Sequence, residues 1–360
     1  MVSDRTLRRC ALAVALGALS PFAPALAQHT ERKVTKLAEG VYEIEHPYRN
    51  DYLAGGNTTV IIGDRQVFVV DPGFLPADAR EDIAQIRQWT DKPVSFVLNT
   101  HFHNDHNLAN RAYMDAFPSI TVISTVETKK DMDLFGPMSE SREEGTTAKF
   151  QKLMDTGLHV NGDPLSADEK KELGEILERR KALQNELKQT TFQSATLTYD
   201  HDFTIDLGHR EVEVKFLGRG NTPGDAVVFL PKEKIAAVGD LVVKPIPYMY
   251  DGYPSEWANT MDRVAQLNAE SIVPGHGPVL HDNSYVYLIR DLLKSAVAQL
   301  NAALPTSGPA MFHKVEDYKS LIDLSSFRQK FAGDDKALAA AFDRAMGDLV
   351  NIAFREASSR

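Results

Sequence analysis

The chain has 360 residues but a single cysteine, Cys10, which lies within its first 27 residues. Those residues resemble a secretory signal peptide, because three arginines precede an apolar stretch and Ala25-Leu26-Ala27 forms a small-residue cleavage site. Removal of this segment leaves a chain without cysteine, which excludes disulfide bonds and thiolate catalysis. The segment also predicts a periplasmic or secreted protein.

Long apolar runs are also absent. The stretch ALAVALGALSPFAP is short and is interrupted by a glycine, a serine and two prolines. These interruptions favour a cleaved signal peptide over a transmembrane anchor. We therefore expect no membrane contact after cleavage.

Positive charge is the third shortage. Lys and Arg together number 40 against 50 Asp and Glu, so the formal net charge is -10 at pH 7. Removal of residues 1–27 takes away three arginines and one aspartate, which moves the charge from -10 to -12. A chain this acidic has no electrostatic basis for binding nucleic acid, so we expect no nucleic-acid partner.

What the chain does contain is an ordinary share of apolar residues, 43%, arranged mainly in two β-rich segments. Residues 33–126 predict a strand at 33–46, a hairpin around Gly63-Asp64-Arg65, and then helix, strand, helix and strand. Residues 193–280 contain further strands. We expect these segments to form two sheets with a shared core, so that residues 28–282 make one domain.

Two helical segments accompany the strands. Residues 127–192 are rich in charge and contain a capping box at Ser166 and Glu169, which predicts a helical insertion packed over the core. Whether this insertion covers a pocket or forms a dimer contact is left open, as is the oligomeric state. Residues 283–360 have amphipathic spacing, which predicts C-terminal helices packed on the domain.

Residues 100–106, THFHNDH, place three histidines and an aspartate at the exit of a predicted strand. Imidazole nitrogens and carboxylate oxygens are ligands of zinc and similar divalent metals. His101 and His103 are two residues apart, so both can point the same way from the strand end. Asp105 and His106 fall where the chain turns into a helix and can face a second point. One loop is therefore expected to serve two adjacent metal ions.

Three distant residues fit the same interpretation. Asp71 in VVDPG, Asp240 in AAVGD and His276 in VPGHG each follow a predicted strand. Each also lies beside a glycine or proline, which lets the backbone turn sharply at the strand end. A single such residue would be a common turn, but three of them together with THFHNDH indicate a metal site.

These motifs and GRGNTPGD span about residues 40–280, and as a set they resemble those of the metallo-β-lactamase superfamily. The resemblance implies an α/β fold, a four-layer αββα sandwich with the metal site at one edge of the two sheets. It also implies zinc as the cofactor, with one or two ions per chain, and iron as the less expected metal. The implied ligands are His101 and His103 for the first metal, Asp105, His106 and His276 for the second, and Asp240 as a bridge, with Asp71 orienting a ligand.

Asn221 departs from the family pattern, because it stands in GRGNTPGD where the family usually has a third histidine for the first metal. An amide oxygen is a much poorer zinc ligand than imidazole, so the first site should be weakened while the second is complete. Three alternatives stay open: one metal in the second site, two metals with Asn221 or water filling the gap, or a site without catalysis. Asn221 could also donate its amide hydrogens to a developing oxyanion.

The resemblance implies hydrolysis of a small molecule. A bound metal lowers the pKa of water from about 15.7 to near 7, and the resulting hydroxide would attack a carbonyl or other ester-like centre, with β-lactams among the candidates. Asp105 or water would protonate the leaving group. The alternatives are an iron-dependent oxygenase of the same fold and a metal-binding protein without catalysis. The aromatic residues that follow Asp240 either line the substrate site or pack on the sheet; they are Tyr248, Tyr250, Tyr253 and Trp257.

Overall fold

The computed structural model describes residues 32–46, 55–160, 162–189, 191–304 and 314–358. The expected signal peptide, residues 1–27, lies outside these ranges. Within them, no helix combines the length and apolar character that crossing a membrane requires.

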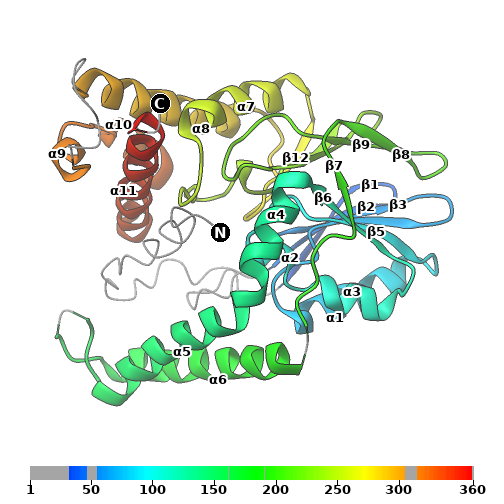
Figure 1. Cartoon of the computed structure of the whole chain (residues 1–360), viewed down its shortest axis with the longest axis horizontal. Helices are drawn as coiled ribbons and strands as arrows, with labels where there is room; N and C mark the ends of the chain where they lie inside the picture. The colour runs from blue at the N-terminus through cyan, green and yellow to red at the C-terminus, as the bar shows by residue number, and fades with distance from the viewer. Residues whose placement is uncertain (1–31, 47–54, 161, 190, 305–313, 359–360) are drawn as a thin grey trace, which may run out of the picture.

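Two sheets lie at the centre of the molecule (Figure 1). The seven-stranded sheet follows the order β1-β2-β3-β4-β5-β6-β7 and the five-stranded sheet the order β12-β11-β10-β9-β8. The strands of the first sheet are β1 (Lys33–Ala38), β2 (Val41–Glu45), β3 (Thr58–Ile62), β4 (Val67–Val70), β5 (Val94–Leu98), β6 (Thr121–Thr125) and β7 (Leu197–Tyr199). Those of the second are β8 (Phe203–Asp206), β9 (Glu211–Lys215), β10 (Val227–Leu230), β11 (Ile235–Ala237) and β12 (Ser271–Val273).

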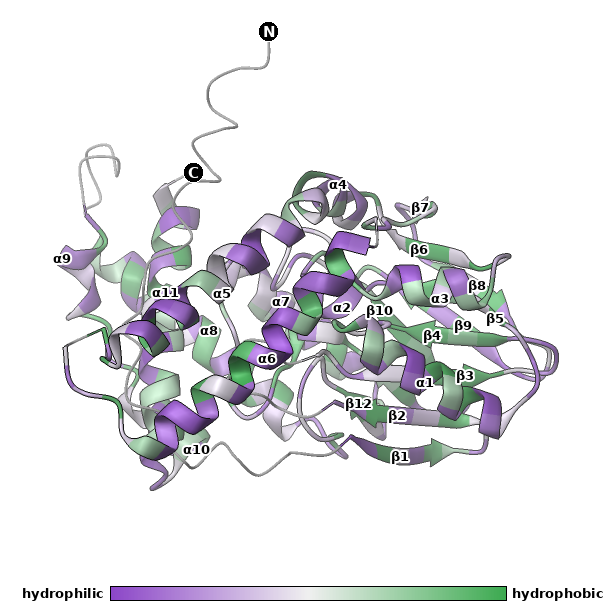
Figure 2. Ribbon diagram, turned by 90° about the horizontal axis from the view of Figure 1, so that it is seen from below, coloured by the Kyte–Doolittle hydropathy of each residue, from purple (hydrophilic) through white to green (hydrophobic). Residues whose placement is uncertain are grey.

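The alternation of side chains along each strand sets the layers. On β4, Phe68 and Val70 pack against the five-stranded sheet, whereas Val67 and Val69 pack against helices on the opposite face. Those helices are α1 (Pro76–Trp89) and α3 (Asn110–Ala116). Because both faces of the sheet are covered, its strands are apolar on both sides, as the green of β3 and β4 in Figure 2 shows.

Helices also cover the outer face of the five-stranded sheet. There α7 (Pro254–Gln266), α8 (Ser284–Ala303) and α11 (Lys336–Ser358) form one apolar cluster with β10 and β11. The predicted four-layer αββα sandwich and the helical C-terminal region are therefore confirmed. The remaining helical elements are α2 (Asn104–Asn107), α4 (Val126–Phe135), η2 (Gly136–Met138), α5 (Ser139–Thr156), α6 (Ala167–Gln189), η3 (Gly239–Leu241), α9 (Glu316–Lys319) and α10 (Ser325–Ala332).

The insertion between β6 and β7 is helical, as the sequence predicts, and it consists mainly of α4, α5 and α6 (Figure 1). The capping box at the start of α6 is formed in both directions, because Ser166 N donates to Glu169 Oε2 (2.8 Å) and Glu169 N donates to Ser166 Oγ (3.2 Å). Leu183 and Leu187 of α6 then pack on Leu108, which follows α2. The insertion is thereby attached to the core beside the histidine cluster.

Two expectations about the strands are wrong. Residues 33–46 form two antiparallel strands, β1 and β2, with a turn at Gly40, whose φ of 69° lies in the left-handed region. The sheets also do not divide at the insertion, because β7 follows it in the chain but pairs in parallel with β6. The chain crosses to the second sheet between β7 and β8.

Glu43 on β2 is buried in this core without compensation. It is 0% exposed, and neither carboxylate oxygen has a hydrogen-bond partner in the described part of the chain. Burial raises the pKa of Glu43 to about 7, from an ordinary value of 4.5. A buried charge of this kind should cost stability at neutral pH.

We expect Glu43→Gln to stabilise the protein at pH 8 and to have little effect below pH 4.5. At low pH the carboxyl group is neutral in both the folded and the unfolded chain; as pH rises through about 7 the folded state loses this advantage. The expected gain is about 3 kcal/mol at most. Urea unfolding of both proteins across this pH range measures it, with Glu211→Gln on exposed β9 as the control. A gain independent of pH would contradict the assignment to Glu43 ionisation.

Candidate metal centre

The carboxyl ends of parallel strands in both sheets meet at one edge of the sandwich. In the first sheet Asp71 follows β4 and His101 follows β5, two strands that are paired in parallel. In the second sheet Asp240 follows β11 and His276 follows β12, which are also parallel. The topology therefore brings side chains from distant parts of the sequence to one place.

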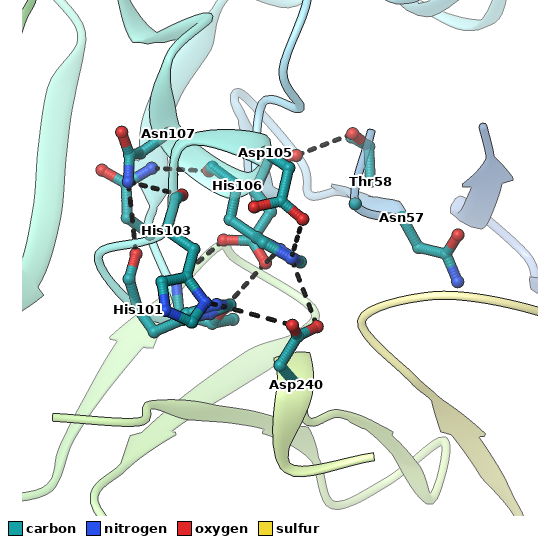
Figure 3. Close-up of polar contacts among 12 residues, drawn as sticks. Asn57, Thr58, His101, His103, Asp105, His106, Asn107 and Asp240 are labelled. Carbon is teal, nitrogen blue, oxygen red and sulfur yellow. Dashed lines mark hydrogen bonds and ion pairs between the residues drawn. The ribbon is translucent and has the colours of Figure 1, made fainter. Parts of the chain in front are cut away.

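All six predicted metal ligands lie in this place (Figure 3). Within each of two groups, one ligand atom per residue lies within 4.8 Å of every other. Asp240 is shared by both groups, as the sequence interpretation requires of a bridging residue. The groups are His101, His103 and Asp240, and Asp105, His106, Asp240 and His276.

Asp71 lies directly behind the histidine loop. Its φ of 54° is uncommon for a residue with a side chain. In this conformation its carboxylate accepts hydrogen bonds from Thr100 N (2.7 Å), Thr100 Oγ1 (2.7 Å) and His106 Nδ1 (2.9 Å). Asp71 therefore orients His106 and the start of the loop without belonging to either ligand group, which is the role the resemblance implies.

These hydrogen bonds determine which ring nitrogens keep a lone pair. His106 donates from Nδ1 to Asp71, so its Nε2 is the acceptor in the neutral ring. Thr100 Oγ1 gives its proton to Asp71 and can only accept from His101 Nδ1, 3.0 Å away, so His101 Nε2 is also an acceptor. Both lone pairs point into the cluster, where the neighbouring atoms are acceptors as well.

The distances between these atoms fit metal coordination. His101 Nε2 lies 3.0 Å from His103 Nδ1, and His106 Nε2 lies 3.3 Å from His276 Nε2. Asp105 Oδ2 is 2.9 Å from His276 Nε2. Ligands bound tetrahedrally at 2.0–2.1 Å are about 3.3 Å apart, so both groups are spaced as a divalent zinc-like ion needs.

The charge of the cluster also calls for a cation. Asp71, Asp105 and Asp240 bring three carboxylates to a site whose histidines are almost entirely buried. Burial alone would lower the pKa of His106, yet the neighbouring carboxylates, Asp240 first, raise it well above the usual value. The field at Nε2 thus favours positive charge, which a divalent metal supplies.

Asn221 is fully buried, and neither atom of its amide has a hydrogen-bond partner among the described residues. Its loop adjoins the histidine loop, because Ala226 N donates to Thr100 O (2.8 Å). Asp225 holds the loop in shape by accepting from Thr222 N (2.9 Å) and Oγ1 (2.8 Å), and burial raises the pKa of Asp225 to about 7. A buried amide without partners is rare and indicates a group reserved for another binding partner.

Three asparagines that the sequence interpretation did not single out hold the histidine loop. Asn107 Nδ2 donates to His103 O (2.7 Å), as Figure 3 shows, and Asn99 Nδ2 donates to His106 O (3.1 Å). Asn110 exchanges hydrogen bonds with Asn99. Their spacing in LNTHFHNDHNLAN was the signal, since short polar side chains at a strand exit commonly bind backbone groups.

The aromatic residues after Asp240 divide between site and core. The Tyr248 ring lies 6.0 Å from the His276 ring and stacks on Tyr250, which is 52% exposed. Trp257 is instead fully buried in the core under α7, and Tyr253 lies beneath the guanidinium of Arg219. Tyr248 and Tyr250 thus border the metal centre, while Trp257 packs on the sheet.

Asp251, in the same segment, reaches the first ligand group. Its Oδ2 lies 3.5 Å from His103 Nε2, the ring nitrogen that does not face His101. On the other side of His103, the ring of Phe102 lies 4.7 Å from the imidazole and 5.4 Å from Phe135 of α4. The centre is therefore bordered by aromatic rings from the insertion and from the segment after Asp240.

Comparison with known proteins agrees with this geometry. A family model described as the metallo-beta-lactamase superfamily matches residues 52–276. The chain is 34% identical over 96 residues to the metallo-beta-lactamase type 2 of Bacillus cereus, which covers 25% of this chain and 37% of that enzyme. It is 22% identical over 253 residues to the linear primary-alkylsulfatase of Pseudomonas sp. (strain ATCC 19151), covering 65% of this chain and 44% of that relative. The matched regions are thus less than half the length of these two relatives.

Solved structures with the same fold cover a larger share of the chain. The metallo-beta-lactamase from Pontibacter korlensis superposes with a TM-score of 0.51 at 19% identity, over 73% of this chain and 99% of that one. FIM-1 from Pseudomonas aeruginosa, in its mono-zinc form, also gives 0.51 at 16% identity, over 78% of this chain and all of that one, 100%. At these identities the likeness establishes the fold.

Proposed function

This chain belongs to the metallo-beta-lactamase superfamily, and we propose that it is an exported hydrolase that cleaves an ester-like or lactam bond with a divalent metal. The metal would be held by the two ligand groups that share Asp240. Zinc is the metal we propose, because the ligands are imidazole nitrogens and carboxylate oxygens at tetrahedral spacing. The export signal proposed for residues 1–27 is part of this proposal.

A single observation carries it: lone pairs from different elements converge with no donor among them. His106 Nε2 has its lone pair directed at His276 Nε2, Asp105 Oδ2 (3.3 Å) and Asp240 Oδ1 (3.2 Å). Buried acceptors that face one another without a proton or a cation repel. A metal ion satisfies all of them together, and the hydrogen bonds to Asp71 and Thr100 fix the histidines in the tautomer that this requires.

The residues of the chain divide the remaining work. A divalent metal bound here would supply a water of low pKa and a Lewis acid for the substrate oxygen. Asp105 is the most exposed carboxylate of the second group, with 28% of its side chain accessible, so its Oδ2 is placed to take a proton from the attacking water and pass it to the leaving group. The Asn221 amide could donate to the oxyanion.

The substrate should carry an apolar group, because aromatic side chains border the centre on two sides. Tyr248 and Tyr250 lie beside His276, and Phe102 lies beside His103. Such rings favour flat or aliphatic groups next to the bond that is cleaved. The relatives include β-lactamases and an alkylsulfatase, so lactams and sulfate esters belong among the candidates together with carboxylic esters.

The test joins metal content to turnover. Protein purified without added metal is analysed by elemental mass spectrometry and assayed with a chromogenic cephalosporin, a p-nitrophenyl ester and a p-nitrophenyl sulfate. We expect one or two zinc ions per chain and turnover of at least one probe that chelation abolishes and zinc restores. Iron with oxygen consumption would indicate the oxygenase alternative. Zinc without turnover of any probe would leave a metal-binding protein and reject the hydrolase.

A further inference from the structure

The segment Gly55–Thr58 joins the loops that carry the second ligand group. Gly56 N donates to Asp105 O (2.9 Å), and Asn57 N donates to Gly275 O (2.7 Å), next to His276. Asn57 Nδ2 binds the same loop through Pro274 O (3.1 Å) and Gly277 O (2.7 Å). Figure 3 shows Asn57 and Thr58 beside the cluster. The relative position of Asp105 and His276 therefore depends on where this backbone lies.

One side of this backbone is fixed by His106. A Cβ atom at Gly56 would lie 2.2 Å from Cε1 of His106 and 2.8 Å from Nε2, the nitrogen directed at the metal. No side chain fits there, so the main chain itself packs against the ring. A small displacement of Gly56 would move or release His106.

The other side is fixed by His46, a residue that the sequence interpretation did not consider. Its side chain is 1% exposed, and Nδ1 donates to Gly56 O at 2.7 Å. Nε2 lies 2.9 Å from Asp82 Oδ2 on α1, and Asp82 is bound in turn by Arg32. His46 is thus anchored to a helix of the outer layer and touches none of the six metal ligands through its hydrogen bonds.

The geometry points to His46 as a positioning residue of the metal centre: we propose that it fixes the Gly56–Asn57 peptide and thereby sets the spacing of the second ligand group. Gly56 O and Asn57 N belong to one peptide plane, so the bond from His46 and the bond to Gly275 form one chain. Gly275 N in turn donates to Gly239 O (2.8 Å), next to the bridging Asp240. This inference rests on the metal centre of the proposed function but on no particular substrate.

The imidazole can be divided by substitution. In His46→Asn the amide nitrogen replaces Nδ1 and keeps the donor to Gly56 O, whereas in His46→Gln it replaces Nε2 and keeps the contact to Asp82. Both variants lose one of two buried hydrogen bonds, so a purely structural role would affect them alike. A positioning role through Gly56 affects them differently.

The experiment measures zinc affinity by competition with a chromogenic chelator, together with the cobalt absorption spectrum and the thermal midpoint. We expect His46→Gln to lose about 10–100-fold in zinc affinity, as outer partners of metal sites do, and His46→Asn to stay within about threefold of the unmodified chain. Ile86→Ala, on the same face of α1 as Asp82, should lower the thermal midpoint and leave affinity unchanged. Equal losses in the two His46 variants would overturn the proposal.

Failure of the inference can be told apart from failure of the proposed function. If the unmodified chain binds no metal, the metal centre itself is rejected. If it binds zinc and His46→Gln binds it equally well, only the role of His46 is rejected. Should His46→Gln not fold, Asp82→Ala frees the imidazole from α1 and must weaken zinc binding; unchanged affinity there overturns the proposal as well.

Discussion

Replacing His276 by alanine should remove the metal from the second ligand group and abolish hydrolysis. His276 Nε2 lies 2.9 Å from Asp105 Oδ2, 3.3 Å from His106 Nε2 and 3.6 Å from Asp240 Oδ1, so it is central to that group. Loss of an outer partner already costs about 10–100-fold in metal affinity, and loss of a ligand should exceed that. Metal content and turnover of the most active probe measure the effect.

The metal content of His276→Ala also decides between one and two metals. If the second group works alone, the variant should retain almost no zinc, while His103→Ala should retain most of it. If both groups are filled, each variant should keep about one ion per chain. His201→Ala removes a histidine whose side chain is 88% exposed, far from the cluster, and controls for nonspecific effects. Full metal content together with full activity in His276→Ala would refute the ligand assignment.

The residues that the sequence placed correctly are those whose chemistry is visible in the motif itself. His101, His103 and His106 are a few positions apart at a strand exit, and each strand end in VVDPG, AAVGD and VPGHG carries one polar side chain next to a sharp turn. The topology of parallel strands then brings these ends together without further information. Periodicity likewise indicated the helices of the insertion, because α6 has both a capping box and an apolar stripe.

The features that the sequence could not predict depend on contacts between distant elements. A histidine between a strand and a turn, such as His46, looks like any surface histidine until Gly56 and Asp82 are placed against its two nitrogens. The assignment of β7 to the first sheet depends on which edge is free after the insertion, which periodicity does not encode. The two interpretations of the aromatic segment were both correct for different residues, since only packing separates Tyr248 from Trp257.

Asn221→Ala should reduce kcat by about 10²–10³-fold while leaving metal content unchanged, if the amide donates to the oxyanion. The residue has the properties this role needs, because it is fully buried, both amide atoms lack partners in the described structure, and its loop is bonded to Thr100 O. Because the interaction forms as charge develops, kcat should fall more than KM rises. Steady-state kinetics and elemental analysis of the same preparation give both quantities.

Asn221→Asp separates this role from that of a metal ligand. The aspartate has nearly the same shape, but it replaces the amide donor with a negative oxygen, which is a better zinc ligand. An oxyanion donor therefore predicts low turnover in both variants, whereas a ligand predicts that alanine loses one metal and aspartate regains it. Asn283→Ala, beside the start of α8, removes a partly buried amide elsewhere and should change neither quantity.

The outcome also determines how the substitution in GRGNTPGD is to be understood. If neither Asn221 variant changes turnover or metal content, the first ligand group contributes nothing to the reaction, and the work falls to the group of Asp105, His106, Asp240 and His276. If alanine lowers turnover alone, replacement of a third histidine has exchanged a metal ligand for a hydrogen-bond donor directed at the substrate. In that case one ion suffices, since Asp240 and His276 complete a four-ligand group without His101 or His103.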